Sequence, residues 1–342
     1  MSALEQPAIP KGSTVLITGV NGFIASHIAD QFLKLGYKVR GTTRNTERNA
    51  WISKVFDSKY GPGQFELVSV PDMRADGAYD EVVKGVSAFV HTATEVSFSP
   101  NPHVVVPAAV AGTTNALLAA AKEPSVKRFV LTSSSSSALI PKPNEYRKVT
   151  VDTWNDEAVA YAYRDPPYEA ERGYPVYAAS KTLAEREAWK FVNEKKPGFT
   201  LNTVLPNICF GATIDLKNQG HTSTSGMLAA LFNGDSSILA SLPAQYYVDV
   251  QDAALLHVAA AIHPGAESER IFAFAEPVNG DGLLEIFHKL YPGRKFPENF
   301  QSDKDLSEIV PIKRAESLLR DLGKDGFTSL ETSVKRNTED IA

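Results

Sequence analysis

The sequence predicts an α/β fold in which a doubly wound parallel sheet is covered by helices on both faces and followed by a smaller C-terminal lobe. Short apolar runs alternate along the chain with longer stretches whose apolar residues recur at helical spacing. Most of the short runs are apolar at every position, which is typical of strands buried on both faces. From about Gly211 the connections become polar and rich in Ser, Thr and Gly, which indicates a separate lobe.

The strands of the predicted sheet are the short runs rich in β-branched and aromatic residues. Strand, helix and strand follow one another repeatedly, and this order predicts parallel pairing. The strands are expected at residues 14–18, 37–42, 65–70, 88–92, 128–132 and 201–205.

The helices between these strands are predicted from apolar residues three and four positions apart. The first lies between the first two strands and is expected to end at Gly36, since glycine is common just after a helix. A second follows the fourth strand, and a third precedes the sixth. The three helical patterns consist of Ile24, Ile28, Phe32 and Leu35, then Val110, Thr114, Leu117 and Leu118, and finally Tyr177, Lys181, Ala184, Ala188 and Phe191.

The C-terminal lobe is predicted to be mainly helical, with helices near residues 226–232, 252–262, 282–291 and 314–322. We expect residues 1–210 to form the first domain and residues 211–342 to form mainly the lobe, with residues 246–275 returning to the first domain. A smaller lobe of this kind suits the closure of a substrate cleft.

The composition is that of an ordinary soluble protein, with 43% hydrophobic and 22% charged residues. A formal net charge of −5 without any basic run makes nucleic acid and anionic membranes unexpected partners. Cys209 is the single cysteine, and the seven histidines lack metal-ligand spacing, so we expect neither an internal disulfide nor a metal. No signal-like segment and no apolar run near the ~20 residues of a membrane span are recognised, which predicts a cytoplasmic protein.

A glycine-rich turn joins the first predicted strand to the first helix, with the sequence TGVNGFIA over residues 18–25. Gly19 permits a tight turn, Gly22 lets the backbone approach a pyrophosphate, and Ala25 lets the helix pack closely on the strand. The helix N-terminus then offers N–H groups to phosphates. The turn predicts a Rossmann-type dinucleotide site. Its cofactor-binding residues are expected to be Gly19, Asn21, Gly22, Phe23 and Ile24.

The end of the second strand indicates which dinucleotide binds. An NAD site would place a carboxylate there, whereas this chain has Arg44, with Arg40 or Arg48 to help it. A guanidinium pairs well with a 2′-phosphate, so the sequence predicts NADPH. The alternative is that these arginines are only solvated surface residues.

Further residues at strand ends are expected to contact the cofactor. Asp72 and Met73 follow the third strand and could flank the adenine ring, and the small Thr92 and Ala93 follow the fourth. His91 is expected to be structural, because no carboxylate or second histidine is near it in sequence.

The third helix carries Tyr177 and Lys181 one turn apart on the same face. A cation beside a phenol stabilises the phenolate and lowers the pKa, which makes the tyrosine a better acid. The fifth strand runs through Thr132 into five serines, so a serine hydroxyl is expected at the ligand-binding edge of the sheet. The alternative for Tyr177 and Lys181 is a solvated helix face, and the alternative for the serine run is a flexible polar loop. Glu185 and Glu187 are predicted to be solvated.

Together these residues resemble the extended short-chain dehydrogenase/reductases over most of the chain, and within them the dihydroflavonol reductase-like branch. The motifs that carry the resemblance are TGVNGFIA (18–25), VKRFVLTSS (126–134), YAASK (177–181) and LPN (205–207). The blocks ALIPKPN (138–144) and QYYV (245–248) are most similar to yeast NADPH-dependent carbonyl (aldehyde) reductases.

The resemblance implies hydride transfer from NADPH to a ketone, ketoester or aldehyde, by a monomer or homodimer. It implies that Tyr177 donates the proton, that Lys181 lowers the pKa of Tyr177 and binds the nicotinamide ribose, and that Ser134 polarises the carbonyl. Ser133 or Ser135 could substitute, because this chain continues the serine run. By the same resemblance Pro206 meets the carboxamide end of the cofactor, and the substrate pocket contains Phe98, Asn207, Met227, Leu242 and Gln245.

Two other functions remain open from the sequence. A nucleotide-sugar epimerase or dehydratase uses the same tyrosine and lysine, but it needs cations for a second pyrophosphate, and residues 211–245 contain only Lys217 as a firm cation. A cofactor-sensing protein would have the fold without chemistry, and such a protein can lose the acid that this chain keeps.

Overall fold

The computed structural model of the chain describes residues 6–237, 243–299 and 301–342. Its centre is a seven-stranded sheet in which every neighbouring pair of strands is parallel, in the order β10-β7-β5-β4-β1-β2-β3. The predicted fold class is confirmed. The strands are β1 (Thr14–Ile17), β2 (Lys38–Thr43), β3 (Phe65–Ser69), β4 (Ala88–His91), β5 (Arg128–Thr132), β7 (Thr200–Pro206) and β10 (Arg270–Ala273).

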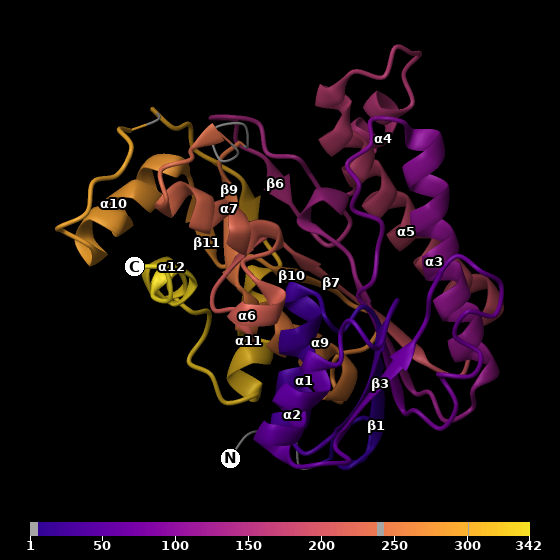
Figure 1. Cartoon of the computed structure of the whole chain (residues 1–342). Helices are drawn as coiled ribbons and strands as arrows, with labels where there is room; N and C mark the ends of the chain where they lie inside the picture. The colour runs from indigo at the N-terminus through magenta and orange to yellow at the C-terminus, as the bar shows by residue number, and fades with distance from the viewer. Residues whose placement is uncertain (1–5, 238–242, 300) are drawn as a thin grey trace.

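The two faces of the sheet carry separate apolar cores because side chains alternate along each strand. Val15 and Ile17 of β1 face one core, and Leu16 faces the other. The first core contains α1 (Phe23–Lys34), α2 (Trp51–Tyr60), α9 (Val250–Ile262) and α11 (Ile312–Asp321), and the second contains α3 (Pro102–Lys122) and α5 (Gly173–Lys195). Figure 1 shows α3 and α5 on the opposite side of the sheet from α1 and α9.

The strand order reverses between β1 and β4, since the chain builds β2 and β3 outward on one side and β5, β7 and β10 outward on the other. In open α/β sheets the crevice at such a reversal, at the carboxyl ends of the strands, is where ligands bind. The glycine turn follows β1 and Thr92 follows β4, so both lie at this crevice.

The C-terminal lobe is built on a second sheet of β8 (Ile208–Phe210), β9 (Gln245–Asp249) and β11 (Glu276–Val278), in the order β11-β9-β8. Its core joins α7 (Ser223–Phe232), α10 (Gly280–Leu290) and α12 (Leu330–Thr338), with Phe232 and Phe287 packed edge to face. In Figure 1 these helices lie on the side of the sheet away from α3 and α5. Within residues 246–275, α9 and β10 return to the large sheet.

The remaining elements are short. They are β6 (Lys148–Val149), which pairs with β12 (Glu308–Ile309), the helices α4 (Asp156–Ala162) and α6 (Leu216–Gln219), and the 3-10 turns η1 (Ser135–Ser137) and η2 (Ala170–Arg172).

Each of the six predicted strands ends within one residue of its observed limits. The predicted C-terminal helices begin two or three residues too late, because capping rather than apolar spacing fixes a helix start. Asp249 caps α9 by accepting a hydrogen bond from the Gln251 amide, and Asn279 caps α10 through the Gly282 amide.

The helix α3 is more apolar than the sequence analysis predicted. By length and composition alone, α3 is apolar enough to cross a membrane, although no such run was predicted. Half of its apolar window is buried in the fold, and the helix packs along α5. Its buried apolar residues pack in the core between β4 and α5.

Candidate active site

The glycine turn has the backbone geometry that a pyrophosphate site requires. Gly19 has a φ of +64°, a conformation that favours glycine, and a Cβ at this position would lie 3.3 Å from the Cβ of Ala93. Gly22 is the N-cap of α1, and no side chain in the described part of the chain caps this helix. The Thr18 hydroxyl accepts hydrogen bonds from the Thr92 and Ala93 amides, both at 2.9 Å, and so joins the ends of β1 and β4.

The turn also contacts the segment that leads into the C-terminal lobe. Gln219 of α6 donates to the Asn21 carbonyl at 3.1 Å and to the Ser26 hydroxyl at 3.0 Å. His27 lies 2.8 Å from the Ala212 carbonyl. The other predicted residues of the turn belong to the core of the first domain, since Phe23 is buried and Ile24 is partly buried.

The arginines after β2 have different environments. Arg44 and Arg48 are exposed beyond the end of the strand. Arg40 pairs with Glu66 at 2.7 Å and donates to the carbonyls of Val82 and Lys84, both at 2.9 Å. The alternative that Arg40 assists a phosphate is therefore wrong, because these groups already hold its guanidinium.

The residues expected beside the adenine ring are held by local contacts. Asp72 pairs with Arg74 at 2.8 Å, and this contact lowers the pKa of the Asp72 carboxyl. Met73 packs against Gly112 of α3, where a Cβ would lie 3.2 Å from the Met73 sulfur. Its carbonyl accepts from Asn115 at 3.1 Å.

Ser134 and Tyr177 meet at the carboxyl end of β5. Ser134 is the N-cap of η1, where the Ser136 hydroxyl lies 2.9 Å from the Ser134 hydroxyl. The Ser134 side chain lies beside the Tyr177 phenol and favours its charged form. Burial raises the pKa of Tyr177, and the Ser134 contact offsets only part of this rise. The lowered pKa predicted for Tyr177 is therefore wrong in this structure, because burial has the larger effect.

Lys181 is buried one turn after Tyr177, and its ammonium donates to the Thr132 carbonyl at 2.8 Å. Burial lowers the pKa of Lys181 to about 8, while the Glu185 carboxylate opposes this shift. The Thr132 hydroxyl lies 2.8 Å from His257. His91 is buried and lies 3.1 Å from the Thr18 hydroxyl, so it supports the strand ends structurally.

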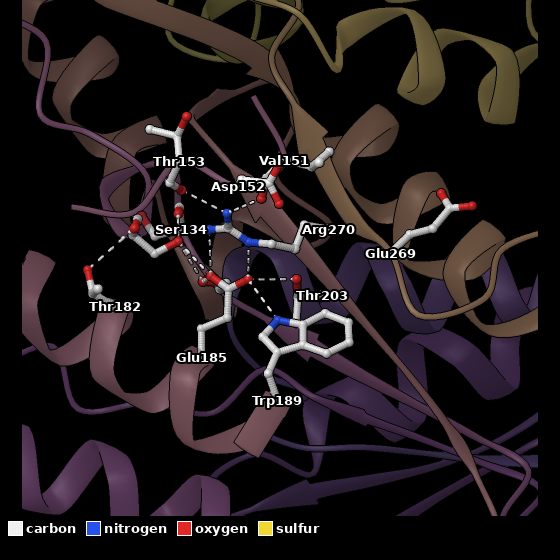
Figure 2. A network of polar contacts seen from close by, with 12 residues as sticks. Ser134, Val151, Asp152, Thr153, Thr182, Glu185, Trp189, Thr203, Glu269 and Arg270 are labelled. Atoms are coloured by element: carbon white, nitrogen blue, oxygen red, sulfur yellow. Dashed lines mark hydrogen bonds and ion pairs between the residues drawn. The ribbon is translucent and has the colours of Figure 1, made fainter. Parts of the chain in front are cut away.

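The environment of Glu185 differs from the predicted one. Glu185 was predicted to be solvated, but it is fully buried one turn beyond Lys181. Figure 2 shows its carboxylate at the centre of a polar network with Arg270, Thr203 and Trp189. The spacing of Glu185 could have indicated its burial, because Glu185 continues the helix face that carries Tyr177 and Lys181.

Ser133 and Ser135, the two alternatives to Ser134, have different surroundings from it. The Ser133 hydroxyl donates to Glu185 at 2.6 Å and is therefore engaged away from Tyr177. Ser135 is buried in the first position of η1. Of the three serines, Ser134 is the one beside the phenol that affects the pKa of Tyr177.

The predicted pocket residues lie in several environments. Phe98 is half exposed, and its ring centroid lies 5.1 Å from that of Tyr177. Pro206 and Asn207 are buried where β7 leads into β8, and the Asn207 side chain accepts from the Ile208 amide at 2.8 Å. Met227 packs on the lobe core, and Gln245 is buried at the start of β9. Leu242 lies outside the described residues.

A metal site is not found in the described ranges, where no group of three or more His, Cys, Asp and Glu residues could hold an ion.

Known proteins resemble this chain over nearly its full length. The profile of the NAD dependent epimerase/dehydratase family matches residues 15–275. Aldehyde reductase 2 of Sporidiobolus salmonicolor is 47% identical over 338 residues, which cover 98% of each chain. Ketoreductase adrE of Penicillium rubens is 39% identical, again over 98% of each chain. The crystal structure of Gre2 from Candida albicans in complex with NADPH superposes with a TM-score of 0.82 at 26% identity, covering 97% of this chain and 98% of Gre2.

Proposed function

Because the chain belongs to the NAD-dependent epimerase/dehydratase family, we propose that it is an NADPH-dependent reductase of ketones, ketoesters or aldehydes in which Tyr177 donates the proton. The observation that carries the proposal is the position of Ser134 beside the Tyr177 phenol, with Lys181 buried one turn away. The names of two close relatives, an aldehyde reductase and a ketoreductase, agree with this reaction.

The residues around the crevice fit NADPH. The close approach of Gly19 to Ala93 and the uncapped start of α1 suit a pyrophosphate, and the exposed Arg44 and Arg48 suit a 2′-phosphate. When bound, NADPH supplies the hydride that reduces the carbonyl carbon. The NADPH complex of Gre2 from Candida albicans supports the same cofactor here.

The side chains of the chain then handle the proton and the developing charge. Ser134 donates a hydrogen bond to the carbonyl oxygen and polarises it. Tyr177 gives its phenolic proton to that oxygen as negative charge develops there. Lys181, one turn away, would stabilise the phenolate left behind, because a cation favours the charged form of a phenol.

Two other functions are less well supported. A nucleotide-sugar epimerase or dehydratase would need cations for a second pyrophosphate, and residues 211–245 contain only Lys217 as a firm cation. A cofactor-sensing protein does not require the paired serine and phenol. We also propose that the enzyme is cytoplasmic and is a monomer or homodimer, which fractionation and light scattering would test.

The test is Tyr177→Phe, compared with the matched change Tyr174→Phe. Tyr174 stacks on Tyr177 with ring centroids 6.1 Å apart, so both variants lose one hydroxyl from the same aromatic group. Oxidation of NADPH is followed with a panel of aryl ketones, ketoesters and aldehydes. We expect the Tyr177 variant to lose roughly 10²–10⁴ in turnover and to keep its NADPH affinity, measured by fluorescence. The Tyr174 variant should stay near the wild-type rate.

Comparable rates for the wild type and Tyr177→Phe would contradict the assignment of the proton donor. Tight NADPH binding without turnover on any carbonyl would favour the sensor. Turnover of a nucleotide sugar alone would favour the epimerase or dehydratase.

A further inference from the structure

We propose that the buried pair of Glu185 and Arg270 is a positioning device, which holds the turn at the end of β5 so that Ser134 faces Tyr177. The inference rests on the proposed function, because it concerns the serine that polarises the carbonyl. Glu185 and Arg270 are positioning residues in this proposal, since they act through the serine turn and not on the substrate.

One side of the Glu185 carboxylate is fixed to the sheet. Its Oε1 atom accepts from Arg270 Nε at 2.8 Å and from the Thr203 hydroxyl at 2.8 Å. Arg270 begins β10 and Thr203 lies in β7, while Glu185 lies on α5. This oxygen therefore ties the helix of Tyr177 and Lys181 to two adjacent strands.

The other side of the carboxylate holds the serine turn. Its Oε2 atom accepts from the Ser133 hydroxyl at 2.6 Å and from the Ser137 hydroxyl at 2.7 Å. The Ser137 hydroxyl also lies 2.8 Å from the Ser134 carbonyl. In the chain, Ser134 thus lies between two residues, Ser133 and Ser137, that both donate to one carboxylate oxygen. This arrangement limits the directions in which its own hydroxyl can point.

Arg270 holds the turn from a second direction. Its Nη1 atom donates to the Val151 and Thr153 carbonyls at 2.6 and 2.7 Å, and its guanidinium stacks on Trp154 at 3.8 Å from the ring centroid. The side-chain amide of the adjoining Asn155 donates to the Ser136 carbonyl at 2.8 Å. One guanidinium therefore fixes both the carboxylate below η1 and the loop that covers it.

The charge of the pair is needed for this function. A buried carboxylate is stable only when its oxygens are paired, and Arg270 provides that compensation in a side chain that is itself almost fully buried. Both oxygens of the ionised carboxylate accept hydrogen bonds here, whereas glutamine has one acceptor oxygen and would turn its donor NH2 group toward other donors. A fixed acceptor at this point is what aligns Ser133 and Ser137 together.

The experiment compares two matched variants, each of which removes one hydroxyl group that donates to Glu185. Ser137→Ala removes a bond to the oxygen that holds the turn, and Thr203→Val removes a bond to the oxygen that holds the sheet. We expect Ser137→Ala to lower kcat roughly tenfold while the KM for NADPH is unchanged. Thr203→Val should keep kcat within about twofold. Both should lower Tm by a similar amount.

Glu185→Gln is the stronger perturbation, and its folding is checked by circular dichroism. If it folds, kcat should fall further than in Ser137→Ala, again with NADPH affinity retained. Equal kcat in the wild type, Ser137→Ala and Thr203→Val would overturn the positioning role alone, and so would equal losses in the two variants. Absence of wild-type turnover on every carbonyl would overturn the proposed function and this inference with it.

Discussion

Replacement of Arg270 by methionine should destabilise the protein strongly, because it leaves the Glu185 carboxylate buried without a counter-charge. The carboxylate is fully buried and the Arg270 side chain is 7% exposed, so water can replace little of the lost interaction. Breaking a buried pair by removing one partner costs about 3–5 kcal/mol. The bonds to the Val151 and Thr153 carbonyls add less, since one of them reaches the surface. With total stabilities of ~5–15 kcal/mol, the loss should be about a fifth or more of the free energy of unfolding.

The assay is urea unfolding of the full chain, followed by circular dichroism, with Arg320→Met as the control. Arg320 pairs with Glu316 at 3.1 Å on the surface, where both side chains are solvated. Exposed pairs of this kind contribute about 0–1 kcal/mol. The two variants remove the same chemical group, so the difference between them measures the effect of burial.

The destabilisation caused by Arg270→Met should depend on pH, because the pKa of Glu185 depends on Arg270. Burial raises the pKa of Glu185, but Arg270 and the serine hydroxyls outweigh it and hold the pKa below the ordinary value. In the wild type this stabilisation is present above the unfolded pKa of ~4.3 and is lost as pH falls through the lower folded pKa. Without Arg270, burial should raise the folded pKa above the unfolded one.

The loss caused by Arg270→Met should therefore be largest near about pH 7 and shrink as pH falls toward about 5, where the carboxyl gains a proton. A loss no larger than that of Arg320→Met would refute the reasoning. A loss that grows as the pH falls would refute it as well.

Two further predictions concern the cofactor site. Gly19→Ala should weaken NADPH binding by tenfold or more (~1.4 kcal/mol) while the far-UV spectrum is unchanged. The φ of +64° is strained for alanine, and a methyl group 3.3 Å from the Ala93 Cβ would force the turn to shift. Titration by fluorescence checks this, and unchanged affinity would contradict a pyrophosphate at the turn. Replacement of Arg44 and Arg48 by alanine should reduce the preference for NADPH over NADH, seen as a rise in the KM for NADPH alone, and equal changes with both cofactors would argue against a 2′-phosphate contact.

The sheet could be predicted from the sequence because its strands are buried on both faces and therefore read as continuous apolar runs. The run at residues 128–132 coincides with β5. The small sheet of β8, β9 and β11 was not predicted, because its outer strands have three residues each and offer no periodicity to detect. Its strands form through pairing with partners distant in sequence, such as Ile208 with Tyr247.

The candidate site shows the same division between local and distant causes. The meeting of Ser134 with Tyr177 follows from parallel topology, which brings strand ends and helix starts to one edge of the sheet. The burial of Glu185 depends on Arg270, 85 residues away, and nothing in the local sequence indicates that partner. The engagement of Arg40 by Glu66 and two carbonyls likewise required the neighbouring strand and loop.

The contacts of Gln219 and His27 have a consequence for chimeric enzymes. The Gln219 side chain donates to the Asn21 carbonyl, and the Ala212 carbonyl lies 2.8 Å from His27. Residues 212–219 therefore pack against the start of α1. A chimera joined at residue 210 would give the host glycine turn a foreign neighbour. A junction placed after Gly220 would exchange most of the C-terminal lobe and keep the native surroundings of the glycine turn.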